Sequence, residues 1–65
     1  ESLESWAEKQ LSKGEDHLLN VATPIFERTM INVALKSTRG NKSEAAKLLG
    51  WGRNTLARKI QELDI

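Results

Sequence analysis

The sequence predicts an all-α domain of four helices, and three observations support this fold class. Apolar residues recur at spacings of three and four along most of the chain, which is the period of a helix that buries one face. Gly14, Gly40 and Gly50 divide the 65 residues into four such segments. No stretch of the sequence alternates apolar and polar residues as a half-buried strand would.

Composition limits the chemistry that the chain can perform. A chain of 65 residues is shorter than a single core usually needs for comfortable stability, so self-association is expected. Cysteine is absent from the sequence, which excludes disulfides and thiolate metal sites. The single histidine, His17, has no second histidine or paired carboxylate motif around it. We therefore expect a domain that is not an enzyme, holds no metal or cofactor and binds no small-molecule ligand.

The sequence also bears on the cellular location of the protein. No apolar run approaches the about 18 residues of a membrane span, and no secretory signal pattern is present. A cytoplasmic protein without membrane contact is expected. Because the chain begins at Glu1 rather than Met, we also expect it to be a fragment of a longer protein.

Charge is distributed unevenly, although the net charge is only +1. Residues 1–20 carry five acids and two bases, whereas the stretch from Lys36 to Lys59 carries seven bases and one acid. This asymmetry favours an anionic partner for the second half of the chain. A basic face that is merely solvated would have the same composition. The motifs are therefore needed to distinguish an anion-binding face from a solvated one.

The first helix is predicted from Leu3, Trp6, Ala7 and Leu11, which share one stripe at helical spacing. Ser2 can cap this helix, and Gly14 can end it.

A long second helix is expected from Glu15 to Thr38, and Pro24 leaves two interpretations open. In the favoured one the helix continues through Pro24 with a kink. In the other it begins there, with Thr23 as N-cap and Pro24 at the tolerated first position. Gly40 is expected to end the helix in the left-handed conformation.

This second helix is apolar on two sides. One broad face carries Leu18, Leu19, Ala22, Ile25, Phe26, Met30 and Val33, and the other carries Val21, Ile31 and Leu35. Two apolar faces need two surfaces to pack against, here the rest of the domain and a second copy of the chain. We expect a homodimer through the first two helices, with residues 1–40 as dimerisation helices and residues 41–65 as a second unit of one compact domain. The expected interface residues are Leu3, Trp6, Leu11, Val21, Ile25 and Ile31.

Two short helices are predicted for residues 41–65. Asn41 can cap a third helix from Lys42 to Leu49, with Glu44 reaching back toward the cap, and Gly50 ends it. A turn with Trp51 packed beneath it then leads to the last helix.

The last helix is expected from Arg53 to Leu63, with Leu56, Ile60 and Leu63 facing inward. Two short helices joined by a glycine-containing turn form a helix-turn-helix unit, whose second helix lies in the major groove of DNA. The small residues Ala45 and Ala46 would allow the close approach that this unit needs. Ordinary helical hairpins share the spacing, so the side chains on the outer face of the last helix must distinguish the two kinds of structure.

That outer face bears side chains that suit the major groove, because Asn and Gln can bind adenine, Arg can bind guanine and Ala can contact the thymine methyl. The expected base contacts are Arg53, Asn54, Ala57 and Arg58. Phosphate contacts are expected on the flanks of this helix and at the start of the third, where free backbone N–H groups favour anions. These residues are Asn41, Lys42, Ser43, Thr55 and Lys59. For Asn41, a role as helix cap alone is an equal alternative.

The run TRGNKSEAAKLLGWGRNTLARKIQELDI, from Thr38 to Ile65, resembles the C-terminal domain of NtrC-type nitrogen regulators and, more broadly, the Fis-type helix-turn-helix family. The segment GWGRNTLARK is more specific to the NtrC type than the general Fis-type pattern of AA, LG and TL. The resemblance is strong from Pro24 onwards and weaker before it.

The resemblance implies a sigma-54-dependent two-component transcription activator of nitrogen metabolism. Such proteins combine a receiver domain, a central ATPase and a terminal domain that dimerises and binds inverted-repeat enhancer sites in double-stranded DNA. A bacterial cytoplasmic protein, associated with the nucleoid when bound, is implied. The family's DNA-contacting positions fall at Arg53, Thr55 and Arg58. The sequence departs from the family at Ala57, where Thr is common, which weakens the case for a base contact there, and at Asp64, where Gly is usual.

Two alternative functions fit part of the pattern. A sequence-blind, Fis-like DNA-bending protein would share the helix-turn-helix unit. A dimerisation or protein-interaction module would use the basic face to dock an acidic partner.

Overall fold

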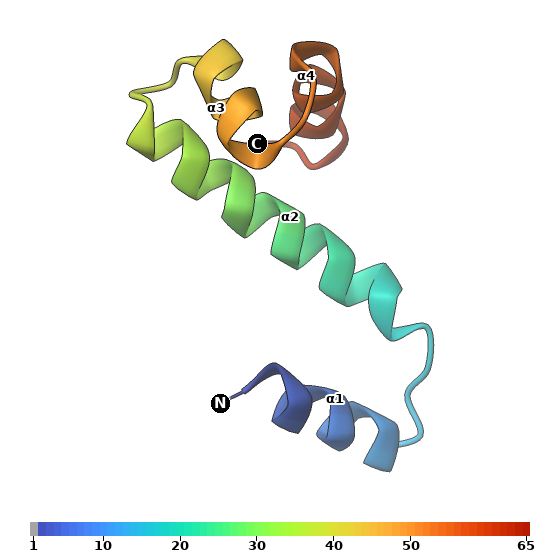
Figure 1. Ribbon diagram of the computed structural model, residues 1–65. Helices are drawn as coiled ribbons and strands as arrows, with labels where there is room; N and C mark the ends of the chain where they lie inside the picture. Colours follow the sequence, from blue (N-terminus) through green and yellow to red (C-terminus); the bar gives the residue numbers. More distant parts are fainter. Residues whose placement is uncertain (1) are drawn as a thin grey trace.

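The computed structural model describes residues 2–65, and all regular structure in that range is helical (Figure 1). The helices are α1 (Leu3–Ser12), α2 (Leu18–Ser37), α3 (Lys42–Leu49) and α4 (Arg53–Glu62). The predicted all-α fold with four helices is confirmed. Glu1, the first residue of the predicted dimerisation segment, lies outside the described residues. Within residues 2–65, no helix is both long enough and apolar enough to cross a membrane.

Helix α1 begins and ends where the sequence predicts. The backbone N–H of Ser5 donates to the side-chain oxygen of Ser2 over 3.1 Å, which caps the helix. Gly14 follows the helix in the left-handed conformation, with φ of 82°. None of the residues of α1 is buried. The helix is therefore formed by local interactions and is not held by the core of its own chain.

Helix α2 starts at Leu18 and runs without a break through Pro24 to Ser37. The interpretation in which the helix continues through Pro24 is confirmed, and the start at Thr23 is wrong. The predicted start at Glu15 is three residues early because His17 takes the left-handed conformation, with φ of 52°. A right-handed helix cannot include such a residue, so α2 begins directly after it.

The end of α2 differs in detail from the prediction. Arg39, rather than Gly40, is the first residue to take the left-handed conformation, with φ of 54°, and Gly40 follows it with φ of 83°. The N–H of Gly40 donates to the carbonyl of Leu35 over 2.7 Å, which closes the last turn in a Schellman motif. An arginine thus occupies the position where glycine carries no steric penalty.

The core lies where α3 and α4 pack on the C-terminal half of α2 (Figure 1). Its buried residues are Ile31, Ala34, Ala45, Ala46, Leu56 and Leu63. Leu35, Leu49, Trp51 and Ile60 are half-buried around them. The predicted placement of Trp51 beneath the turn is confirmed, as is the inward face of α4. This core draws on residues from both sides of position 40.

Helix α1 lies apart from this core and forms a V with the N-terminal half of α2 (Figure 1). The space between the arms of the V is an open groove of about 740 Å³, walled largely by apolar side chains of α1 and α2. The radius of gyration of the chain is 14.2 Å, against about 11 Å for a compact domain of this length. The monomer is therefore elongated, with an apolar groove at one end and the helix-turn-helix unit at the other.

Candidate nucleic-acid interface

The turn between α3 and α4 fixes how α4 is presented. Gly50 takes the left-handed conformation with φ of 79°, and the N–H of Trp51 donates to the carbonyl of Ala46 over 2.9 Å. A Cβ atom at Gly50 would meet nothing within 4 Å, so the turn needs glycine for its backbone conformation and not for space. Because Ala45 and Ala46 are buried, α3 lies close against its neighbours and holds this turn in place.

Helix α4 buries one side and exposes the other. Leu56 is fully buried. Asn54 and Arg58 lie on the side of the helix opposite Leu56, with Ala57 beside them and Arg53 at the first position. All four predicted base-contacting residues are exposed, so the structure brings them together on one accessible surface.

One ion pair on this surface was not foreseen in the sequence. Nη1 of Arg58 lies 3.3 Å from Oε2 of Glu62, one helical turn further on. Both side chains remain largely accessible, with exposed fractions of 59% and 51%. The i, i+4 spacing of an arginine and a glutamate is visible in the sequence and could have indicated this pair.

The start of α3 gathers three of the predicted phosphate-contacting residues. Asn41, Lys42 and Ser43 are exposed in sequence order at the N-terminal end of this helix. The side-chain oxygen of Asn41 accepts from the N–H of Glu44 over 3.1 Å, so its capping role is confirmed. The hydroxyl of Thr38 lies 2.9 Å from the carbonyl of Ala34 and 3.1 Å from that of Asn41, and thereby ties the end of α2 to the start of α3.

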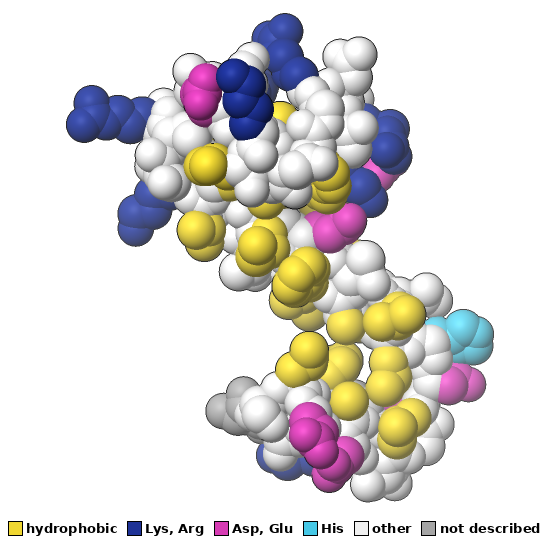
Figure 2. Space-filling view, in the orientation of Figure 1, with side chains coloured by type: hydrophobic (Ala, Val, Ile, Leu, Met, Phe, Trp, Pro, Cys, Tyr) yellow, Lys and Arg dark blue, Asp and Glu magenta, His cyan; other side chains and the backbone are white. Residues whose placement is uncertain are grey.

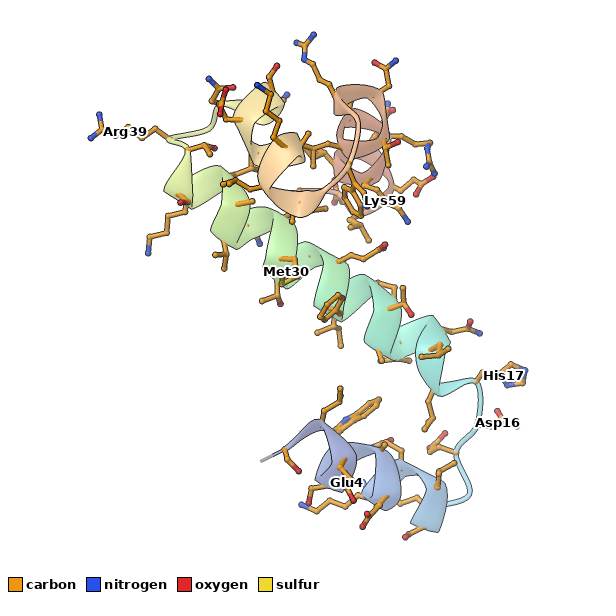
Figure 3. The ribbon with its side chains drawn as sticks, viewed as in Figure 1. Glu4, Asp16, His17, Met30, Arg39 and Lys59 are labelled. Atoms are coloured by element: carbon orange, nitrogen blue, oxygen red, sulfur yellow. The ribbon has the colours of Figure 1, made fainter. Side chains whose placement is uncertain are left out.

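Lys59 was expected to contact phosphate from the flank of α4, but its side chain faces α2 instead. Its Nζ atom is 3.1 Å from Oε2 of Glu27 in α2, and the exposed fractions of the two side chains are only 23% and 18%. In Figure 3 the Lys59 side chain extends from α4 on the side nearer α2. This placement favours a structural role over the expected phosphate contact. Position 59 lies three residues from buried Leu56 on the helix, but only the packing of α2 reveals a carboxylate opposite it.

Most of the basic side chains and the apolar groove occupy different ends of the molecule. Lys and Arg side chains surround the end formed by α3, α4 and the C-terminus of α2, interrupted by a few acids (Figure 2). One of those acids is Glu44, which lies 3.7 Å from Nζ of Lys47. Apolar side chains line the inner side of the V between α1 and α2 in the same view. A polyanion and an apolar partner would therefore meet the molecule at separate surfaces.

The predicted dimer-interface residues divide into two groups. Leu3, Leu11, Val21 and Ile25 are exposed, and Trp6 is half-buried in the wall of the groove. Ile31 is fully buried in the core of its own chain, so its assignment to the interface is wrong. The helix is apolar on both sides in the sequence, and periodicity alone could not tell which side faces the core.

Several large apolar side chains on the exposed side of α2 were missing from the predicted interface. They are Leu19, Phe26, Met30 and Val33. Their common face was visible in the sequence, because they recur at helical spacing over nearly four turns.

The described residues hold no group of three or more His, Asp or Glu side chains that could bind a metal ion. Nδ1 of His17 lies 2.6 Å from Oδ1 of Asp16 in the loop between α1 and α2, where both side chains are exposed. This pair is remote from the α3–α4 end of the molecule (Figure 3).

Comparisons with known proteins agree with the resemblance in the sequence. The chain is 54% identical to the DNA-binding transcriptional regulator NtrC of Proteus hauseri over 63 residues. These residues are 97% of this chain and 13% of the relative. The NtrC of Escherichia coli strain K12 is 54% identical over 61 residues, 94% of this chain and 13% of the relative. The NtrC of Azospirillum brasilense is 56% identical over 39 residues, 60% of this chain and 8% of the relative.

The chain thus spans about an eighth of the length of the first two relatives. No solved structure matches it. Residues 23–63 match the family described as bacterial regulatory protein, Fis family. This match covers the second helix from Thr23 onwards together with all of α3 and α4. The chain belongs to the Fis family of bacterial regulatory proteins.

Proposed function

We propose that this chain is the DNA-binding part of an NtrC-type transcription regulator, and that it binds double-stranded DNA as a homodimer. Each copy lays α4 in one major groove, and the two copies together bind an inverted repeat. The observation that carries this proposal is the exposed surface formed by Arg53, Asn54, Ala57 and Arg58 on a helix whose opposite side is anchored in the core.

The chemistry of this surface suits sequence-specific binding. The guanidinium of Arg58 can bind the O6 and N7 atoms of guanine, and the amide of Asn54 can bind adenine. Phosphate contacts from Asn41, Lys42 and Ser43 would hold the start of α3 against the DNA backbone and set the register of α4. Thr55 is half-buried on the flank of α4 and remains in the proposed phosphate set.

Homodimerisation is supported by the surface that the monomer leaves uncovered. The accessible surface is 5109 Å², whereas a folded monomer of 7.3 kDa is expected to expose about 4,200 Å². The excess of about 900 Å² is close to the about 800 Å² that each partner buries in a standard interface. The proposed interface comprises Leu3, Trp6, Leu11, Val21 and Ile25, together with the apolar face that includes Phe26 and Val33.

The wider function proposed rests on the resemblance to NtrC-type regulators. The inverted repeat is an enhancer site, and the longer protein is a sigma-54-dependent two-component activator of nitrogen metabolism with its own ATPase. This chain supplies the DNA-binding step alone and is not catalytic. It acts in the bacterial cytoplasm and lies on the nucleoid when bound.

A binding selection tests the proposal. The 65-residue chain is used to enrich duplexes from a randomised pool, and the enriched duplex is then titrated against random duplex at several salt concentrations. We expect an inverted repeat, an affinity at least about a thousandfold above that for random duplex, and a steep loss of affinity with salt. Equal affinity for both duplexes would instead indicate sequence-blind DNA bending. Failure to bind any duplex would leave a protein-interaction module.

Replacing Arg58 by Ala tests the assignment of the surface. Removal of a residue that binds guanine should cost about 1 to 3 kcal/mol of binding free energy and relax the base preference at one position of the selected site. The helical content should stay unchanged, because Arg58 is exposed. An unchanged selected site would remove Arg58 from the set of base contacts.

A further inference from the structure

We propose that Glu62 is a specificity-determining residue that positions Arg58 for a base and keeps it from binding phosphate. The inference rests on the proposed DNA binding through α4. Its structural basis is the 3.3 Å contact between Nη1 of Arg58 and Oε2 of Glu62.

The geometry leaves Arg58 competent to bind guanine while Glu62 holds it. A guanidinium has five N–H donors in a rigid planar fork, and the contact with Glu62 involves one of its terminal nitrogens. The remaining donors can still form the two parallel hydrogen bonds that guanine accepts. Because the pair limits the conformations of a long side chain before DNA arrives, less conformational freedom is lost on binding.

The exposure and contacts of Glu62 match a role directed at Arg58. Its side chain is 51% exposed, so it does not fill the core, and the helix ends with Leu63 as its cap residue. Lys59 is three residues away and could compete for the carboxylate. However, the ammonium of Lys59 is engaged by Glu27 of α2. Arg58 is left as the cation that Glu62 contacts on this helix.

The negative charge of Glu62 lowers the affinity of the chain for DNA of the wrong sequence. Phosphates repel a carboxylate on the surface that approaches DNA, and an arginine held by that carboxylate is less able to turn toward the backbone. At the correct site, the bonds from Arg58 to guanine offset this repulsion. At other sites nothing offsets this repulsion, so Glu62 widens the difference in affinity between the specific duplex and random duplex.

The test compares the wild-type chain with Glu62→Gln on two probes, the duplex selected by the wild-type chain and a random duplex. We expect affinity for random duplex to rise about threefold and affinity for the selected duplex to fall about threefold, so that their ratio drops roughly tenfold. The slope of log affinity against log salt on random duplex should steepen by up to about 1, because one more phosphate contact becomes available. Circular dichroism checks that the variant is folded.

Glu62→Asp separates the two effects. It keeps the charge but shortens the side chain, which draws the carboxylate back from the guanidinium of Arg58 and weakens their contact. Affinity for the selected duplex should fall, while affinity for random duplex should change less than in Glu62→Gln. Wild-type affinity for the selected duplex in this variant would contradict the positioning role.

Glu44→Gln is the matched control. It removes the same charge from an exposed glutamate on α3, where the carboxylate contacts Lys47 rather than a base-contacting residue. Its effect should be the same on both duplexes and leave their ratio unchanged.

A double-mutant cycle with Arg58→Ala provides the decisive measurement. If Glu62 acts through Arg58, Glu62→Gln should no longer change the ratio once Arg58 is absent. The inference is overturned if the effect persists without Arg58, or if Glu62→Gln shifts both affinities equally, as Glu44→Gln is expected to do. A wild-type chain that does not distinguish the two duplexes would contradict the proposed function itself, which keeps the two failures apart.

Discussion

The ammonium of Lys59 in α4 lies 3.1 Å from a carboxylate oxygen of Glu27 in α2, and solvent reaches less than a quarter of either side chain. Nearby, the guanidinium of Arg28 in α2 donates to the carbonyl of Leu63 at the end of α4 over 3.3 Å. These polar contacts join the helix that carries the proposed DNA-reading surface to the helix that carries the proposed dimer face. The position of α4 is therefore tied to α2 by charge as well as by the core.

Lys59→Met should lower the free energy of unfolding by about 1 to 2 kcal/mol, because the carboxylate of Glu27 loses its partner in a partly buried place. The salt dependence of DNA binding should not change, since this lysine is already neutralised within the chain. Urea denaturation and DNA titration at several salt concentrations measure the two quantities. Exposed Lys42→Met is the matched control, with unchanged stability and a salt slope reduced by about 1. A reduced slope for Lys59→Met would restore the phosphate contact to this residue.

Phe26→Glu should convert the dimer into a folded monomer. Phe26 is 64% exposed in the single chain, so a charge there costs little in the monomer but would be buried without a partner in the dimer. Sedimentation equilibrium gives the mass, and circular dichroism gives the helical content. Gln61→Glu adds the same charge on exposed α4 and should leave the dimer intact. A wild-type chain that is monomeric at all concentrations would refute the proposed interface.

Ile31→Ala and Ile25→Ala make the same chemical change at positions with opposite roles. Ile31 is fully buried in the core, so its truncation should lower the free energy of unfolding by about 2 to 4 kcal/mol. Ile25 is exposed on the proposed interface, so its truncation should weaken dimerisation more than folding. Chemical denaturation over a range of protein concentrations separates the two effects, because the dimer contribution depends on concentration. Equal losses that do not depend on concentration would argue against the division of α2 into a core side and a dimer side.

Gly50→Ala should destabilise the chain by about 1 to 2 kcal/mol, because alanine disfavours the left-handed conformation observed there even though its Cβ has room. Arg39→Gly should have the opposite sign. Arg39 already takes that conformation, and glycine should recover about 0.5 to 1 kcal/mol after the entropy that it adds to the unfolded chain. Thermal unfolding measures both changes. A neutral Gly50→Ala would show that the turn adapts.

Local sequence information was enough for the helices and for most of the recognition surface. Ser2 and Asn41 cap their helices through their own side chains, and apolar spacing alone identified the buried side of α4. Capping and periodicity depend on residues within one or two turns, so they can be seen without knowing the fold. The exposed positions of Arg53, Asn54, Ala57 and Arg58 follow from the same periodicity.

Tertiary structure decided what depends on residues far apart in the chain. Helix α2 is apolar on both sides, and only the packing of α3 and α4 assigned Ile31 to the core and left Phe26 exposed. Lys59 lies at a helix position that permits either a phosphate contact or an ion pair within the chain. Only the tertiary structure shows that it pairs with Glu27, 32 residues earlier. Periodicity shows that a helix has a face to cover, but it does not contain the identity of the surface that covers it.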